Sequence, residues 1–291
     1  PGRPITIQGN DNGGGNANPV IFTTQLYDSS DFGTPWYDSD GKKIYRIKVP
    51  NDYIWEIAVD GTRVPYYPTT NHRDIINHLK DGHVAYKRAK GDHWIYYRKD
   101  FGKVGSVEVP ARLNAIYANT KSYIMLDGID TFGGAACNSP VSDTTLLSQV
   151  LFTSSSGNYQ HITVKNSEHS SGAIGVSFRL AGSGTANDLM MDNIYAHHNR
   201  YYQAYAVGTV TNDVYDSQTM DGLTIQNSEF AYCADVPSDA GDQECGAVRR
   251  VKNILFTNNY IHDNGYDFST GYKPTSDPTN SSLFTFIENY N

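Results

Sequence analysis

The amino-acid sequence predicts an all-β protein whose main part is a parallel β-helix, a solenoid of stacked rungs. The 291 residues include 22 tyrosines and 26 glycines but 4 methionines, and 19% of them are charged. Aromatic and β-branched residues fit a pleated strand, whereas Gly, Asn, Asp and Ser favour turns. Long segments with the 3.6-residue apolar period of helices are absent. A repeated short motif then predicts how the strands are arranged.

Five segments share the pattern apolar, any, apolar, any, Asn or a polar substitute. They are ITVKN at 162, LMMDN at 189, LTIQN at 223, ILFTN at 254 and FTFIE at 284, and the related IMLDG lies at 124. Successive starts are 27, 34, 31 and 30 residues apart. Stacked repeats would bury the apolar faces of these strands in one continuous core. An Asn at a fixed place in each rung can adopt left-handed backbone geometry and stack on the next Asn.

Each repeat continues through a polar turn into a second alternating segment, such as 172–178. These turns, above all Tyr260-Ile-His-Asp-Asn-Gly265, resemble the rungs of the pectate-lyase-like right-handed parallel β-helix superfamily. The resemblance covers about residues 113–291, and it is specific for fold rather than for activity. Because the members are mostly extracellular lyases, hydrolases and epimerases, it implies a secreted or cell-surface protein with a polysaccharide as partner.

The first third of the chain departs from the repeat. Residues 4–9 (PITIQG) resemble the opening strand of the superfamily, so residues 1–33 are expected to begin the β-helix. Residues 34–112 are expected to form a β-rich insertion that contains a short helix over 71–79. Similar insertions occur in β-helix glycoside hydrolases, which favours hydrolysis. The rungs are expected over 113–291, and the absence of a capping segment predicts that the natural protein continues.

Charge and cysteine content narrow the possible partners. The net charge of −8 argues against nucleic acid, which requires a basic stripe. No apolar run of 18 residues is present, so no transmembrane segment is expected. Cys233 and Cys245 flank an acidic loop that a disulfide would close, with reduced thiols as the alternative.

The resemblance places a substrate groove along the outside of one parallel sheet. If Ile174, Val176 and Phe178 point inward, then Ser177 and Arg179 point outward. The same argument, rung by rung, assigns to the groove Arg179, Tyr202, Tyr205, Arg249, Arg250 and Asp267. The acidic loop would border it with Asp235, Asp239, Asp242 and Glu244.

Two reactions fit such a surface. A lyase needs a base and a cation that stabilises the developing charge, whereas a hydrolase needs two carboxylates. The candidate catalytic residues are Asp267, Arg179, Arg250, Asp242 and Glu244. The candidate substrate-binding residues are Tyr202, Tyr205, Arg249 and His198. Hydrolysis is favoured over elimination.

Each candidate also has an ordinary structural interpretation. His198 and His262 lie in turns where histidines commonly serve as hydrogen-bonding residues, and arginine pairs are commonly solvated. The acidic loop offers the oxygen ligands that calcium prefers, but such loops are often only solvated, so no metal ligand is assigned and calcium stays an open alternative. The competing hypothesis for the whole chain is a non-catalytic solenoid that binds glycan or serves as an adhesin or assembly component.

Overall fold

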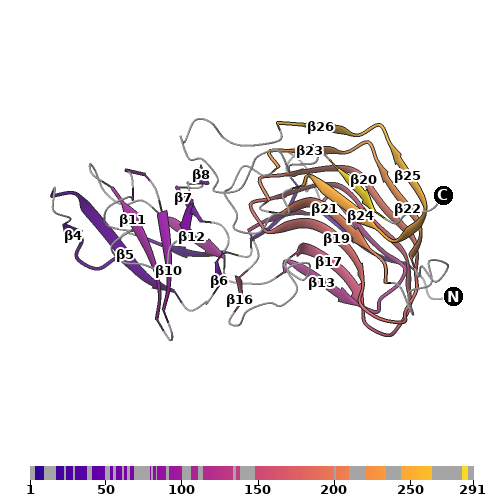
Figure 1. Cartoon of the computed structure of the whole chain (residues 1–291), viewed down its shortest axis with the longest axis horizontal. Helices are drawn as coiled ribbons and strands as arrows, with labels where there is room; N and C mark the ends of the chain where they lie inside the picture. Colours follow the sequence, from indigo (N-terminus) through magenta and orange to yellow (C-terminus); the bar gives the residue numbers. More distant parts are fainter. Residues whose placement is uncertain are drawn as a thin grey trace.

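The computed structural model describes residues 4–9, 18–22, 24–28, 30–37, 41–49, 53–54, 57–60, 62–63, 66–68, 79, 81–82, 84–89, 92–99, 106–110, 114–133, 136–137, 148–199, 201–209, 220–233, 244–263 and 284–287. The regular structure of these residues is all β-strand. The helix expected over 71–79 lies, except for Leu79, outside them. The fold is a right-handed parallel β-helix with a β-rich insertion, as predicted (Figure 1).

One wall of the β-helix, here called the repeat sheet, contains the repeated motifs. Its parallel strands in spatial order are β1 (Ile5–Gln8), β14 (Ile124–Asp127), β18 (Tyr159–Ser170), β20 (Ala186–His197), β22 (Met220–Gln226) and β25 (Val251–Thr257). The long strands β18 and β20 turn at an Asn and continue into a second wall, here called the short-strand row. Its other members are β2 (Val20–Phe22), β15 (Asp130–Phe132), β23 (Glu229–Ala231) and β26 (Tyr260–His262).

The third wall, here called the front sheet, follows the short-strand row in each rung. Its strands are parallel: β13 (Ile116–Asn119), β17 (Ser148–Ser154), β19 (Ile174–Leu180), β21 (Tyr202–Val207), β24 (Gly246–Arg249) and β27 (Thr285–Ile287). In Figure 1 these strands are drawn in front, and their first residues lie on the side of the insertion.

The predicted repeat forms the core. Ile162, Leu189 and Leu223 pair in register across the repeat sheet, as do Val164 and Met191 beside them. All five are buried in one cluster that also contains the inward residues of the front sheet. Full burial of such a side chain stabilises the fold by roughly 1.5–3 kcal/mol. Stacking therefore provides the core that a single rung lacks.

The Asn residues of the repeat occupy left-handed backbone positions, as expected. Asn166, Asn193, Asn227 and Asn258 have φ between 51° and 53°. The amide of Asn193 donates to Asn166 Oδ1 at 2.9 Å, and that of Asn166 donates to Asp127 Oδ1 at 2.7 Å. A second left-handed position follows the short-strand row in each rung. It is occupied by Gly133, Ser171, His198, Tyr232 and Asp263.

The insertion has its own sheets and core. One sheet contains β4 (Trp36–Tyr37), β5 (Lys43–Val49), β11 (Asp92–Arg98), β10 (Val84–Ala89) and β9 (Tyr66–Pro68). The other contains β3 (Thr24–Tyr27), β12 (Val107–Pro110), β7 (Ala58–Val59) and β8 (Thr62–Arg63). Because β3 pairs with β12 and Tyr27 and Phe32 pack in this core, the insertion includes residues before 34.

Two further contacts fix the segments around the front sheet. Strand β6 (Tyr53–Ile54) of the insertion pairs with β16 (Ala136–Cys137), which precedes the first long strand of the front sheet (Figure 1). The predicted disulfide between Cys233 and Cys245 is confirmed.

Among the described residues, no helix has the length and apolar character needed to cross a membrane.

Candidate functional site

The outer face of the front sheet is where the sequence places the groove. Val176 and Phe178 pack in the β-helix core, so the intervening Ser177 and the following Arg179 point outward, as alternation predicts. The neighbouring rungs extend two outward rows along the solenoid axis. One row contains Leu151, Ser177, Tyr205 and Ala247, and the other contains Thr153, Arg179, Val207 and Arg249.

A second apolar cluster lies outside the β-helix core on this face. It contains Ala173, Ile174, Tyr201, Tyr202, Tyr205 and Ala247. The rings of Tyr202 and Tyr205 have centroids 4.8 Å apart, and each residue is 5% exposed. Ile174, expected in the main core, belongs to this outer cluster instead. The two tyrosines therefore pack against each other, and their role in substrate binding stays a prediction.

Glu244 lies at the start of this sheet, next to the disulfide-bonded Cys245. The Cys245 carbonyl accepts a hydrogen bond from Gln203 N at 2.7 Å, which places Glu244 beside the first residue of β21, Tyr202. The acidic residues predicted around it, Asp235, Asp239, Asp242 and Asp267, lie outside the described residues.

Buried polar atoms gather on the same sheet. Within the described ranges, the buried side-chain atoms that make no hydrogen bond are Gln149 Oε1, Ser177 Oγ, Glu244 Oε2 and Arg249 Nε. Gln149, Ser177 and Arg249 lie in front-sheet strands, and Glu244 precedes β24. Leaving such an atom unsatisfied costs about 1–3 kcal/mol. Buried polar atoms without a partner are uncommon in folded proteins, so their concentration on this face marks it as a candidate functional surface.

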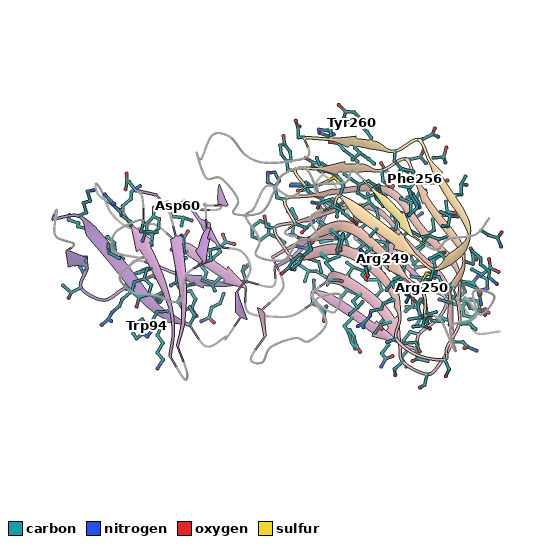
Figure 2. All side chains as sticks on the ribbon, in the orientation of Figure 1. Asp60, Trp94, Arg249, Arg250, Phe256 and Tyr260 are labelled. Atoms are coloured by element: carbon teal, nitrogen blue, oxygen red, sulfur yellow. A yellow bond between two sulfur atoms is a disulfide. The ribbon has the colours of Figure 1, made fainter. Side chains whose placement is uncertain are left out.

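The arginines lie toward the other end of the strands. Arg179 and Arg249 flank Val207 on successive rungs, and Arg250 follows β24 in a left-handed conformation (Figure 2). Burial lowers the pKa of Arg179, and the nearby Tyr205 hydroxyl opposes this shift. Glu244 and Arg249 are five positions apart, about 16 Å along an extended strand. The predicted residues thus form an aromatic and carboxylate group at the start of the sheet and a cationic group at its end.

The structure also shows a cluster that the sequence argument did not assemble, on the outside of the short-strand row. Glu168, Tyr195, Glu229 and Tyr260 pair in register on four successive rungs. His197 Nε2 contacts Glu168 Oε1 at 2.9 Å, and His262 Nε2 contacts Glu229 Oε1 at 2.9 Å. The sequence signal was the Tyr-x-His spacing at 195–197 and 260–262, whose Glu partners lie about one repeat earlier in the chain.

Each histidine of this cluster stacks on the tyrosine of its own strand. The ring centroids are 4.2 Å apart for Tyr195 and His197 and 4.3 Å apart for Tyr260 and His262. His198, predicted to bind substrate, stacks on Tyr232 at 4.2 Å and contacts His197 Nδ1 through its own Nδ1 at 2.6 Å.

Hydrogen bonds raise the pKa of one histidine of this wall, and burial lowers the pKa of another. Glu229 and Asp263, both hydrogen-bonded to His262, raise the pKa of that imidazole. The buried His169, bonded to Thr131 Oγ1 at 2.8 Å and Ser167 Oγ at 2.9 Å, has its pKa lowered to about 3 by desolvation. No group of three or more His, Cys, Asp or Glu residues within the described ranges is arranged to hold a metal ion.

The stacked rungs, the Asn positions and the three walls define a right-handed parallel β-helix. Among solved structures, the chain is similar to XylC, solved as a complex with xylose, with a TM-score of 0.54 and 10% identity. The match covers 89% of this chain and 49% of XylC, so the chain spans about half the length of that protein. At this identity the likeness establishes the fold. No protein-family model and no curated protein matches the sequence.

Proposed function

We propose that this chain is part of a secreted carbohydrate-active protein that binds a polysaccharide on the outer face of the front sheet and hydrolyses it. The observation that supports the proposal most is Glu244. Its Oε2 atom is buried beside the outer aromatic cluster and has no hydrogen-bond partner among the described residues. A carboxyl group in such surroundings suits either role in glycoside hydrolysis, proton donation to the leaving oxygen or attack on the sugar.

The remaining predicted residues receive roles that follow from their positions. Arg179 and Arg249 would donate hydrogen bonds to the hydroxyl groups of the bound chain. The likeness to a protein solved with xylose is consistent with a carbohydrate ligand but does not identify the sugar. Asp242 and Asp267 stay predictions for the second carboxylate, and calcium in the acidic loop stays a proposal.

The experiment is a digestion screen of neutral and uronate polysaccharides that measures reducing ends and ultraviolet-absorbing unsaturated products together, with and without a calcium chelator. We expect reducing ends without unsaturated products, and an activity at least about 100-fold lower in Glu244→Gln. The control is Glu108→Gln, a change on β12 in the insertion. Unsaturated products that depend on Arg179 and Arg250 would instead establish a lyase.

A non-catalytic glycan-binding module is the second candidate. None of the six described strands of the front sheet contains Asp or Glu, so these strands do not themselves supply a carboxylate pair. Retention on a polysaccharide without either type of product would favour this candidate.

A further inference from the structure

Six aromatic rings form a continuous row over three rungs on the outside of the short-strand row. They are, in order of contact, Tyr195, His197, His198, Tyr232, His262 and Tyr260. Successive ring centroids are 4.2, 4.9, 4.2, 6.3 and 4.3 Å apart. We call this row the aromatic belt.

Two tyrosines of the belt are exposed, whereas the histidines His197 and His262 are largely covered, with side chains 15% and 21% exposed. Tyr232 is 36% exposed and Tyr260 is 62% exposed, and Figure 2 shows Tyr260 on the outside of β26. Ala196 in β20 and Phe230 in β23, the strand that precedes Tyr232, are fully buried. The inward side of this wall is therefore filled by the core, and the rings are presented to the outside.

Carboxylates flank the belt. The side chains of Glu168, Glu229 and Asp263 are 49%, 45% and 57% exposed. Each carboxylate binds a histidine through one oxygen atom in the contacts described above, and a carboxylate has further acceptor capacity. Their negative charge would repel a polyuronate, so the belt favours an uncharged ligand that donates hydrogen bonds.

The backbone is left-handed at two rings of the belt, as it also is at the stacked pair Tyr123 and His161 outside the belt. His198 and Tyr232 adopt φ of 53° and 51°, at the left-handed position that Gly133 and Asp263 occupy in other rungs. A bulky residue there costs of order 1–3 kcal/mol. Two consecutive rungs therefore retain an aromatic ring at a position where Gly or Asn would be less strained.

We propose that the aromatic belt is a second binding surface, separate from the front sheet, for a neutral polysaccharide chain. Tyrosine faces would stack on sugar rings while Glu168 and Glu229 accept hydrogen bonds from sugar hydroxyls. Tyr195 and Tyr260 are two rungs apart, about 9.6 Å at the usual strand spacing. This is comparable to the length of a disaccharide unit in an extended β-linked chain. The proposal deepens the proposed function, because such a surface would hold the polymer that the front sheet cleaves, but binding here does not require cleavage.

The test is affinity electrophoresis of the whole chain in gels containing a neutral polysaccharide, xylan or mixed-linkage glucan, or polygalacturonate. The double variant Tyr195→Ala/Tyr232→Ala is expected to bind the neutral polymer about tenfold more weakly, equivalent to about 1.4 kcal/mol. The matched control is Tyr123→Ala, because Tyr123 also stacks on a histidine, His161, at 4.7 Å but lies outside the belt. Its binding should equal that of the unmodified chain.

Tyr232→Asn separates binding from folding, because Asn tolerates the left-handed conformation and removes the ring. We expect this variant to remain as stable as the parent and to bind more weakly. Unchanged binding by both belt variants, retention on polygalacturonate alone, or no retention on any neutral polymer would overturn the proposal. Glu244→Gln distinguishes the two sites, since it should lower cleavage at least about 100-fold, while Tyr195→Ala/Tyr232→Ala should still weaken electrophoretic retention in the Glu244→Gln background.

Discussion

Glu168 and His197 are joined across neighbouring rungs by a 2.9 Å contact, and the same arrangement recurs two rungs further on between Glu229 and His262. In both cases a tyrosine stacks on the histidine from its own strand. The outside of the short-strand row thus contains a duplicated Glu, Tyr and His unit. Titration of His262 links stability to pH.

The first prediction concerns His262, whose pKa is raised by Glu229 and Asp263. A raised pKa in the folded state gives stabilisation that is present below the ordinary histidine value of about 6.5 and is lost as pH rises through the folded value. Glu229→Gln should lower the His262 pKa in an NMR titration and reduce the fall in unfolding free energy between pH 6 and pH 8. Glu108→Gln is the control. An unchanged His262 titration in Glu229→Gln would contradict this prediction.

His169 should make the unfolding free energy depend on pH in the opposite direction, because its stabilisation is lost as pH falls. Its pKa of about 3 keeps it neutral in the folded chain, while the unfolded chain takes up a proton below about 6.5. This group alone should therefore lower the unfolding free energy by about 2 kcal/mol between pH 7 and pH 5. Urea unfolding of His169→Gln at both pH values should lack that loss. Equal pH dependence in the two proteins would show that the buried site accommodates a protonated ring.

Removal of the Cys233–Cys245 disulfide should destabilise the fold. The bridge closes a segment with a sequence separation of 12, for which chain entropy predicts about 3 kcal/mol. Cys233→Ser/Cys245→Ser should show this loss in urea unfolding. Cleavage activity should also fall, because Glu244 adjoins Cys245. Reductant should reproduce the loss in the parent chain and have no effect on the double variant, and insensitivity of the parent to reductant would contradict the prediction.

Two substitutions at Asn193 separate the cost of left-handed backbone strain from the cost of a lost side-chain hydrogen bond. Asn193→Ala loses the bond to Asn166 and keeps a side chain at φ 51°, so it should destabilise the fold by about 1–2 kcal/mol. Asn193→Gly loses the same bond but relieves the left-handed strain, so it should cost less. Thermal unfolding of the two variants checks this order. Equal or reversed losses would contradict the prediction, because they would mean that left-handed strain contributes little here and that the lost hydrogen bond accounts for the destabilisation.

The fold was predictable because its signal is local and repeated. Apolar alternation followed by Asn marks each rung, and the register from Ile162 to Leu223 follows from aligning these motifs. The start of the insertion was not predictable in this way. Its first strand, β3, pairs with β12 far along the chain, and no local feature at Thr24 signals that partner.

The candidate site was predictable only in part. Alternation assigns Arg179 to the outside of the front sheet, but it does not show that Tyr202 and Tyr205 are covered there, since burial depends on distant segments. The belt was missed for a related reason. Glu168 and His197 come together only through the register of two rungs, and loops of variable length between rungs obscure that register in the sequence.

Hydrogen–deuterium exchange with and without a saturating oligosaccharide product tests the central claim most directly. Our account predicts ligand-dependent protection at the starts of β21 and β24, around Tyr202 and Glu244, that persists in Tyr195→Ala/Tyr232→Ala. Protection confined to other walls of the β-helix, or none on the front sheet at saturation, would contradict the placement of the carbohydrate site.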